Sequence, residues 1–167
     1  MKKNIILVLV VVLFFVGLAY FGKVAQKATP IASGTEKVGN GSLSADEKFY
    51  DFGSISMKNG KVSRLFKVSN LTDEDVFLER VTTSCMCTVA YVINGEDKKG
   101  PFGMAGHGGA VPKVNDTIKA GETREIEVVF DPNAHGPAGV GLIDRIITLA
   151  DKNGEELNLE IKAVVTP

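Results

Sequence analysis

The chain has 167 residues, a formal net charge of −1 and 44% hydrophobic residues. Acidic and basic side chains are nearly balanced and interspersed, which disfavours nucleic-acid binding because that function needs a basic face. Once the apolar N-terminal segment is set aside, the remaining chain is long enough for one domain and too short for two.

Residues 4–22 carry no charged side chain, and Lys2, Lys3 and Lys23 flank them. As a helix this segment would be about 28 Å long, close to the thickness of the hydrocarbon core of a bilayer. The two lysines before it favour the cytoplasmic side, so the rest of the chain is predicted to lie outside the cytoplasm. Small residues at the spacing of a cleavage site do not follow directly, although a cleaved signal peptide stays an alternative. We therefore predict that residues 1–22 form a single-pass signal anchor in the cell membrane.

Residues 23–45 are mostly Gly, Ser, Thr, Ala and Lys, with few large apolar side chains. Such a composition is typical of a flexible linker, which here would hold a domain away from the membrane surface.

Residues 46–167 are predicted to form one all-β domain. Residues 125–130 and 157–165 alternate strictly between apolar and polar side chains, which is the pattern of a strand with one face on a core. Shorter apolar runs lie at residues 64–68, 76–81, 88–93 and 143–149. Turn dipeptides such as Asn94-Gly95 and Asn153-Gly154 separate these runs. About seven short strands at this spacing predict an antiparallel β-sandwich, with a small barrel as the alternative.

Residues 100–109 interrupt this pattern because half of them are glycine. We expect a long connection here rather than a strand, since glycine has a low preference for ordered backbone.

The only two cysteines, Cys85 and Cys87, are separated by one residue. On an extended strand their sulfurs would point to the same side, with Cα atoms about 6.6 Å apart. That distance is at the upper limit for a disulfide, which would close a small and easily reduced ring. Three interpretations stay open: a buried structural pair, a redox-sensitive disulfide, and a metal site.

The metal interpretation needs further donors in addition to the two thiolates. Thiolate and thioether groups suit Cu(I), and imidazole suits copper and zinc. Both histidines of the chain, His107 and His135, lie in glycine-rich segments, and Met104 precedes His107 closely. The candidate ligands of copper or zinc are therefore Cys85, Cys87, His107, His135 and Met104.

Five segments together resemble the bacterial domain-of-unknown-function family 1573 (DUF1573), an immunoglobulin-like module. They are residues 50–55, 66–72, 81–88, 118–122 and 126–131. The third segment contains Ser84-Cys85-Met86-Cys87-Thr88, which matches the family's Ser-Cys-Gly-Cys-Thr hallmark except at Met86. The glycine-rich residues 100–109 also depart from the family pattern. The resemblance covers about residues 46–165 and implies an immunoglobulin-like sandwich with a membrane-tethered or exported location, but no activity.

No sequence motif of an enzyme is present: the chain has no phosphate-binding loop, no Gly-x-Ser-x-Gly and no His-Glu-x-x-His. We therefore predict a non-enzymatic, membrane-anchored interaction or scaffold module outside the cytoplasm, with a protein of the cell envelope as its partner. The alternative is an extracytoplasmic metal-handling protein that binds Cu(I) or Zn(II) through cysteine, histidine and methionine.

Overall fold

The computed structural model describes residues 41–106 and 112–167. The predicted anchor at residues 1–22 and most of the predicted linker lie outside these residues. Within the described part of the chain, no helix is long and apolar enough to cross a membrane.

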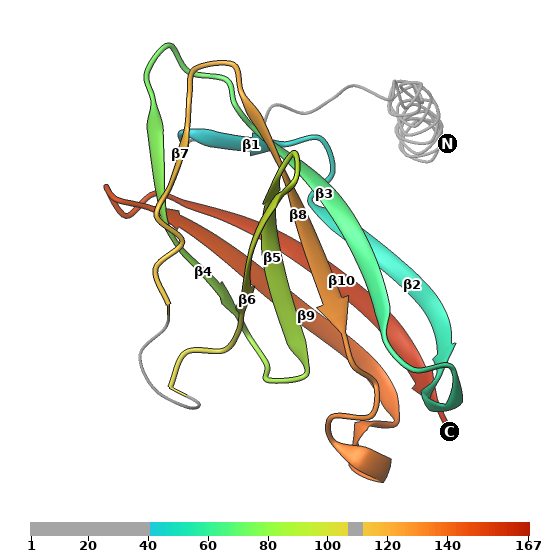
Figure 1. Cartoon of the computed structure of the whole chain (residues 1–167). Helices are drawn as coiled ribbons and strands as arrows, with labels where there is room; N and C mark the ends of the chain where they lie inside the picture. The colour runs from blue at the N-terminus through green and yellow to red at the C-terminus, as the bar shows by residue number, and fades with distance from the viewer. Residues whose placement is uncertain (1–40, 107–111) are drawn as a thin grey trace, which may run out of the picture. The chain divides into compact units, whose positions relative to one another are not determined.

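The described residues form two five-stranded β-sheets, which are stacked to make a sandwich (Figure 1). The first sheet has, in spatial order, β1 (Leu43–Ala45), β3 (Val62–Asn70), β8 (Thr123–Phe130), β5 (Thr88–Asn94) and β6 (Asp97–Phe102). The second has β2 (Phe49–Ser56), β10 (Glu156–Thr166), β9 (Gly141–Asp151), β4 (Val76–Thr83) and β7 (Asp116–Ile118). Two short 3-10 turns, η1 (Met57–Asn59) and η2 (Gly136–Gly139), complete the fold. The predicted all-β class is confirmed.

The hydrophobic core lies between the two sheets and follows the predicted alternation. In β10, the inward side chains are at most 5% exposed: Leu157, Leu159, Ile161, Ala163 and Val165. In β8 of the other sheet, Ile126, Val128 and Phe130 belong to the same buried cluster. Because the side chains of a strand point alternately to opposite faces, a strict period of two is enough to place these residues inside.

One strand pair differs from the antiparallel sandwich that we expected. β2 and β10 run parallel, with Phe49 opposite Glu160, while the other named strand pairs are antiparallel. The prediction of a wholly antiparallel sandwich is therefore wrong at this pair. A hairpin forces its two strands to be antiparallel, but nearly the whole domain separates β2 from β10 in sequence.

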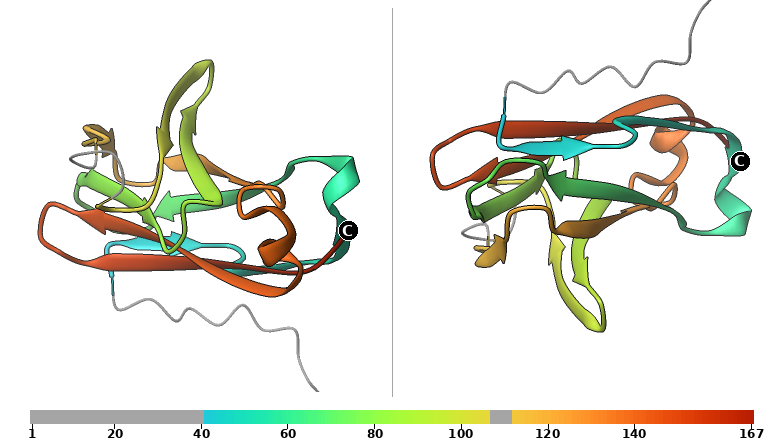
Figure 2. Two further views of the ribbon diagram at one scale, coloured as in Figure 1. Left: turned by 90° about the horizontal axis from the view of Figure 1, so that it is seen from below. Right: turned by 90° about the horizontal axis from the view of Figure 1, so that it is seen from above.

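Strands also occur where none was predicted. The short β1 begins the first sheet inside the segment predicted to be a linker. The expectation that residues 100–109 form only a connection is wrong for residues 100–102, which end β6. Phe102 is 3% exposed and pairs with Ala90, so burial of one aromatic side chain outweighs the low strand preference of its glycine neighbours. Figure 2 shows the β5–β6 hairpin projecting from the sandwich.

Candidate functional site

Both cysteines lie in the turn between β4 and β5, residues 84–87. The prediction that they lie on an extended strand is therefore wrong. The turn is closed by the Thr88 N–H, which donates to the Cys85 carbonyl at 3.1 Å. Ser84 ties the turn to β9, since its N–H donates to the Ile146 carbonyl and its Oγ accepts from the Ile146 N–H. Because the chain forms a turn here, the cysteine Cα atoms are 5.3 Å apart, closer than the spacing that we expected for a strand.

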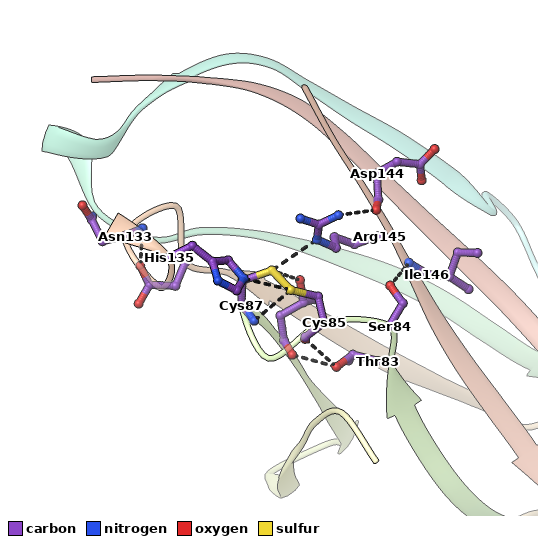
Figure 3. Close-up of a disulfide and its surroundings, with 11 residues drawn as sticks. Thr83, Ser84, Cys85, Cys87, Asn133, His135, Asp144, Arg145 and Ile146 are labelled. Atoms are coloured by element: carbon purple, nitrogen blue, oxygen red, sulfur yellow. Dashed lines mark hydrogen bonds between the residues drawn. A yellow bond between two sulfur atoms is a disulfide. The ribbon is translucent and has the colours of Figure 1, made fainter. Parts of the chain in front are cut away.

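The two sulfurs form a disulfide whose halves have unequal access to solvent (Figure 3). Cys87 is 3% exposed and belongs to the hydrophobic core, whereas Cys85 is half-buried. Met86, between them, is 55% exposed. An external reagent therefore meets Cys85 before Cys87.

His135 approaches Cys85 from the loop between β8 and β9, where it precedes η2. Its Nε2 lies 3.2 Å from the Cys85 Sγ (Figure 3). The loop is fixed in place because the Asp131 N–H donates to the Cys87 carbonyl and the Asn133 N–H donates to the Asp131 carboxylate. The structure thus places His135, one of the candidate ligands, beside Cys85.

Arg145, on β9, contacts Cys87 on the side of the disulfide away from His135. Its Nε donates to the Cys87 Sγ at 3.2 Å, and one of its terminal nitrogens donates to the Asp144 carbonyl at 2.7 Å (Figure 3). Arg145 was not among the residues predicted from sequence. A signal was present, since Arg145 is in phase with Ile143 and Ile147, which face the core. A charged side chain in that phase indicates a partner inside the sandwich.

The candidate ligands predicted from sequence are only partly brought together. The ligand atoms of Cys85, Cys87 and His135 lie within 4.8 Å of one another. Met104 pairs through its backbone with Thr83, two residues before Cys85. His107 lies outside the described residues. Two thiolates and one imidazole form a donor set that fits Cu(I) or Zn(II), provided that the disulfide is first reduced, because thiolates are the ligands.

A second buried polar cluster surrounds Arg124 near the start of β8. The Arg124 side chain is 4% exposed, and its Nε donates to the Asp116 carboxylate at 2.7 Å. The remaining guanidinium nitrogens donate to the carbonyls of Thr117 and Thr123 and to the carboxylate of Glu122. The Lys119 backbone N–H, followed by the Arg124 guanidinium, holds the pKa of Glu122 below its usual value.

The fold and the cysteine turn define a β-sandwich domain with a Cys-x-Cys site at one end. The sequence model of the family described as "Protein of unknown function (DUF1573)" matches residues 43–100, a segment that includes both cysteines. The resemblance to that family is therefore confirmed over this segment. No curated protein matches the chain.

Solved structures with a similar fold are distant in sequence. A protein of unknown function from Porphyromonas gingivalis W83 is 14% identical over 73% of this chain and 46% of that chain, with a TM-score of 0.53. The secreted serine protease VesC from Vibrio cholerae is 11% identical over 80% of this chain and 25% of that chain, with a TM-score of 0.47. This chain thus spans less than half the length of either protein. The first likeness supports the fold alone, and the second is too weak for any inference.

Proposed function

We propose that this protein is a non-enzymatic interaction or scaffold module of the immunoglobulin-like type, held outside the cytoplasm by an N-terminal anchor. The charge-free segment at residues 4–22 and the preceding lysines support the location. The observation that carries the interaction role is a group of exposed apolar side chains on one sheet.

These side chains lie on the outer face of β2, β10 and β9. Their exposed fractions range from 44% to 76%, and they are Phe49, Leu142, Ile146 and Val164. In the strand register, Phe49 and Ile146 flank Glu160, while Leu142 pairs with Val164. Lys162 lies between these two rows and forms ion pairs with Asp144 and Glu160. Large apolar side chains that gather on one exposed face are a feature of protein-binding surfaces, and the ion pairs of Lys162 partly neutralise the charged row between them.

Site-specific crosslinking in intact cells tests the interaction role. A photoreactive residue at position 142 should give a discrete crosslinked product, and Ile146→Glu should abolish that product. The matched control is a photoreactive residue at Lys67, which is exposed on the outer face of β3 in the other sheet. Equal products from both positions, or none from either, would contradict the proposal.

Fractionation tests the location. The full-length chain should stay with membranes, and protease added to intact protoplasts should digest residues 46–167. A mature form that begins near residue 30 and floats free would contradict the anchor.

A second candidate function, metal handling, is favoured by the convergence of Cys85, Cys87 and His135 within 4.8 Å. We propose that the reduced protein holds Cu(I) or Zn(II) with these three residues. In a metal-uptake measurement, Cys85→Ser with Cys87→Ser should abolish binding, and His135→Ala should weaken it. If the fully reduced wild-type protein takes up neither metal at micromolar concentration, this candidate fails and the interaction role is unaffected.

A further inference from the structure

The Cys85–Cys87 disulfide is poorly suited to stabilising the fold. A cross-link stabilises a protein mainly by shortening the free loops of the unfolded chain, and the effect grows with loop length. With a sequence separation of 2, this disulfide closes almost no chain. Both cysteines lie in the single turn that joins β4 to β5, so the disulfide connects no strands that the chain does not already connect there.

The surroundings of the two sulfurs instead favour cleavage of the disulfide by attack on Cys85, with Cys87 as the leaving sulfur. Cys85 is only half-buried while Cys87 is 3% exposed, so an external thiolate reaches Cys85 more easily. The Arg145 Nε lies 3.2 Å from the Cys87 Sγ. A guanidinium at this position stabilises negative charge on the sulfur that leaves when the disulfide is attacked at Cys85.

We propose that the Cys85–Cys87 pair is a thiol–disulfide exchange site that oxidises a peptide or protein dithiol, with Cys85 as the attacked sulfur and Arg145 as the residue that stabilises Cys87 as it leaves. This activity goes beyond the proposed interaction role. One chain exchanges one disulfide, so the reaction is stoichiometric and agrees with a non-enzymatic module.

The reaction has two balanced steps. In the first, one partner thiolate attacks the Cys85 Sγ, a mixed disulfide forms, and the Cys85–Cys87 bond breaks with its electron pair on Cys87. In the second, the other partner thiolate attacks the partner sulfur of the mixed disulfide, and Cys85 leaves with the electron pair. The partner loses two electrons and two protons, and Cys85 and Cys87 gain them as two thiols, the protons passing through water.

The exposed Met86 points to the class of partner. A flexible thioether side chain beside the attacked sulfur adapts to apolar neighbours of varied shape. The expected partner is therefore a dithiol within a partly apolar peptide segment.

The asymmetry of the two sulfurs is tested with single-cysteine variants of the full-length protein in detergent. The rate of reaction with 5,5′-dithiobis(2-nitrobenzoate) should be at least about tenfold higher for Cys85 in the Cys87→Ser variant than for Cys87 in the Cys85→Ser variant. Equal rates in two folded variants would overturn the assignment of Cys85 as the attacked sulfur.

The role of Arg145 is tested on the intact disulfide with a synthetic peptide that contains two cysteines. The rate at which the peptide reduces the Cys85–Cys87 disulfide, measured by alkylation and mass spectrometry, should fall about tenfold in Arg145→Gln. Arg145→Lys should restore most of the rate, because it restores the charge. The matched control, Arg80→Gln, removes an exposed arginine of β4 and should react as the wild type does.

Circular dichroism establishes that each variant is folded. The single-cysteine variants keep Arg145, so that comparison tests the proposal even if an Arg145 variant does not fold. An unchanged rate in folded Arg145→Gln, or a wild-type disulfide that the peptide does not reduce, would overturn the proposal.

Discussion

Two arginines that point into the sandwich occupy different environments, and the contrast separates a stabilising site from a reactive one. Arg124 is 4% exposed and donates to two carboxylates and two carbonyls. Arg145 is half-buried and donates to one sulfur and one carbonyl. A cation with oxygen acceptors all around it is held in a single arrangement. A cation beside a sulfur has a negatively charged partner only when that sulfur becomes a thiolate.

The partners of the two arginines also differ, since one is a carboxylate and the other is a sulfur whose charge depends on its redox state. Asp116 is fixed by Arg124 on one side and by Lys99 on the other, with the Lys99 Nζ at 3.2 Å. Cys87 instead depends on the redox state of Cys85 for its charge. The Arg124 cluster should therefore govern stability, and the cysteine turn should govern reactivity.

Asp116→Ala should lower the free energy of unfolding by about 3–5 kcal/mol, because it leaves the buried Arg124 without its closest carboxylate. Urea unfolding followed by circular dichroism measures the change. Arg80→Gln, an exposed charge change, is the control and should alter stability by about 0.5 kcal/mol or less. A loss below about 1 kcal/mol for Asp116→Ala would show that the Arg124 cluster is not a stabilising site.

Replacing both cysteines by serine should lower the free energy of unfolding by at most about 1.5 kcal/mol, since the disulfide closes so short a loop. Thermal unfolding of the double variant against the oxidised wild type gives the value. A variant that does not fold would mean that the cysteine turn, like the Arg124 cluster, is needed for stability.

Arg145→Gln should change the stability of the oxidised protein by only about 0.5 kcal/mol, because a half-buried hydrogen bond to a neutral sulfur contributes little. The measurement is the urea midpoint, with Arg124→Gln as the matched substitution in the other cluster. If the two glutamine variants lose the same stability, the contrast between the arginines is wrong.

Glu122→Gln should reduce the dependence of stability on pH in the acid range. The folded protein holds the pKa of Glu122 below its ordinary value of 4.5, chiefly through the Lys119 N–H. A lowered pKa stabilises the folded state above the ordinary value, and this contribution is lost as the pH falls through the folded value. Urea midpoints at pH 7 and pH 3 should therefore differ less in Glu122→Gln than in the wild type. An identical difference would show that Glu122 has no part in the acid sensitivity.

The sequence by itself determined most of the strands and the inward faces of two of them. The predicted runs at residues 125–130 and 157–165 lie within β8 and β10, and their apolar phase is buried. Turn dipeptides marked the ends of strands, as at Asn94-Gly95 between β5 and β6. Alternation and turn chemistry are local properties of the chain, so a single sequence shows them. The cysteine pair and His135 were likewise candidates from residue type and position.

The tertiary structure alone decided which strands pair and what surrounds the sulfurs. Neither the parallel pairing of β2 with β10 nor the Arg124–Asp116 ion pair follows from local pattern, because each joins residues whose approach depends on the whole sandwich. Arg145 lies 58 positions from Cys87 in sequence, and their contact exists because Ser84 ties the cysteine turn to β9. Residue type showed which side chains have suitable chemistry, but their distances depend on long-range strand pairing, which the core determines as a whole.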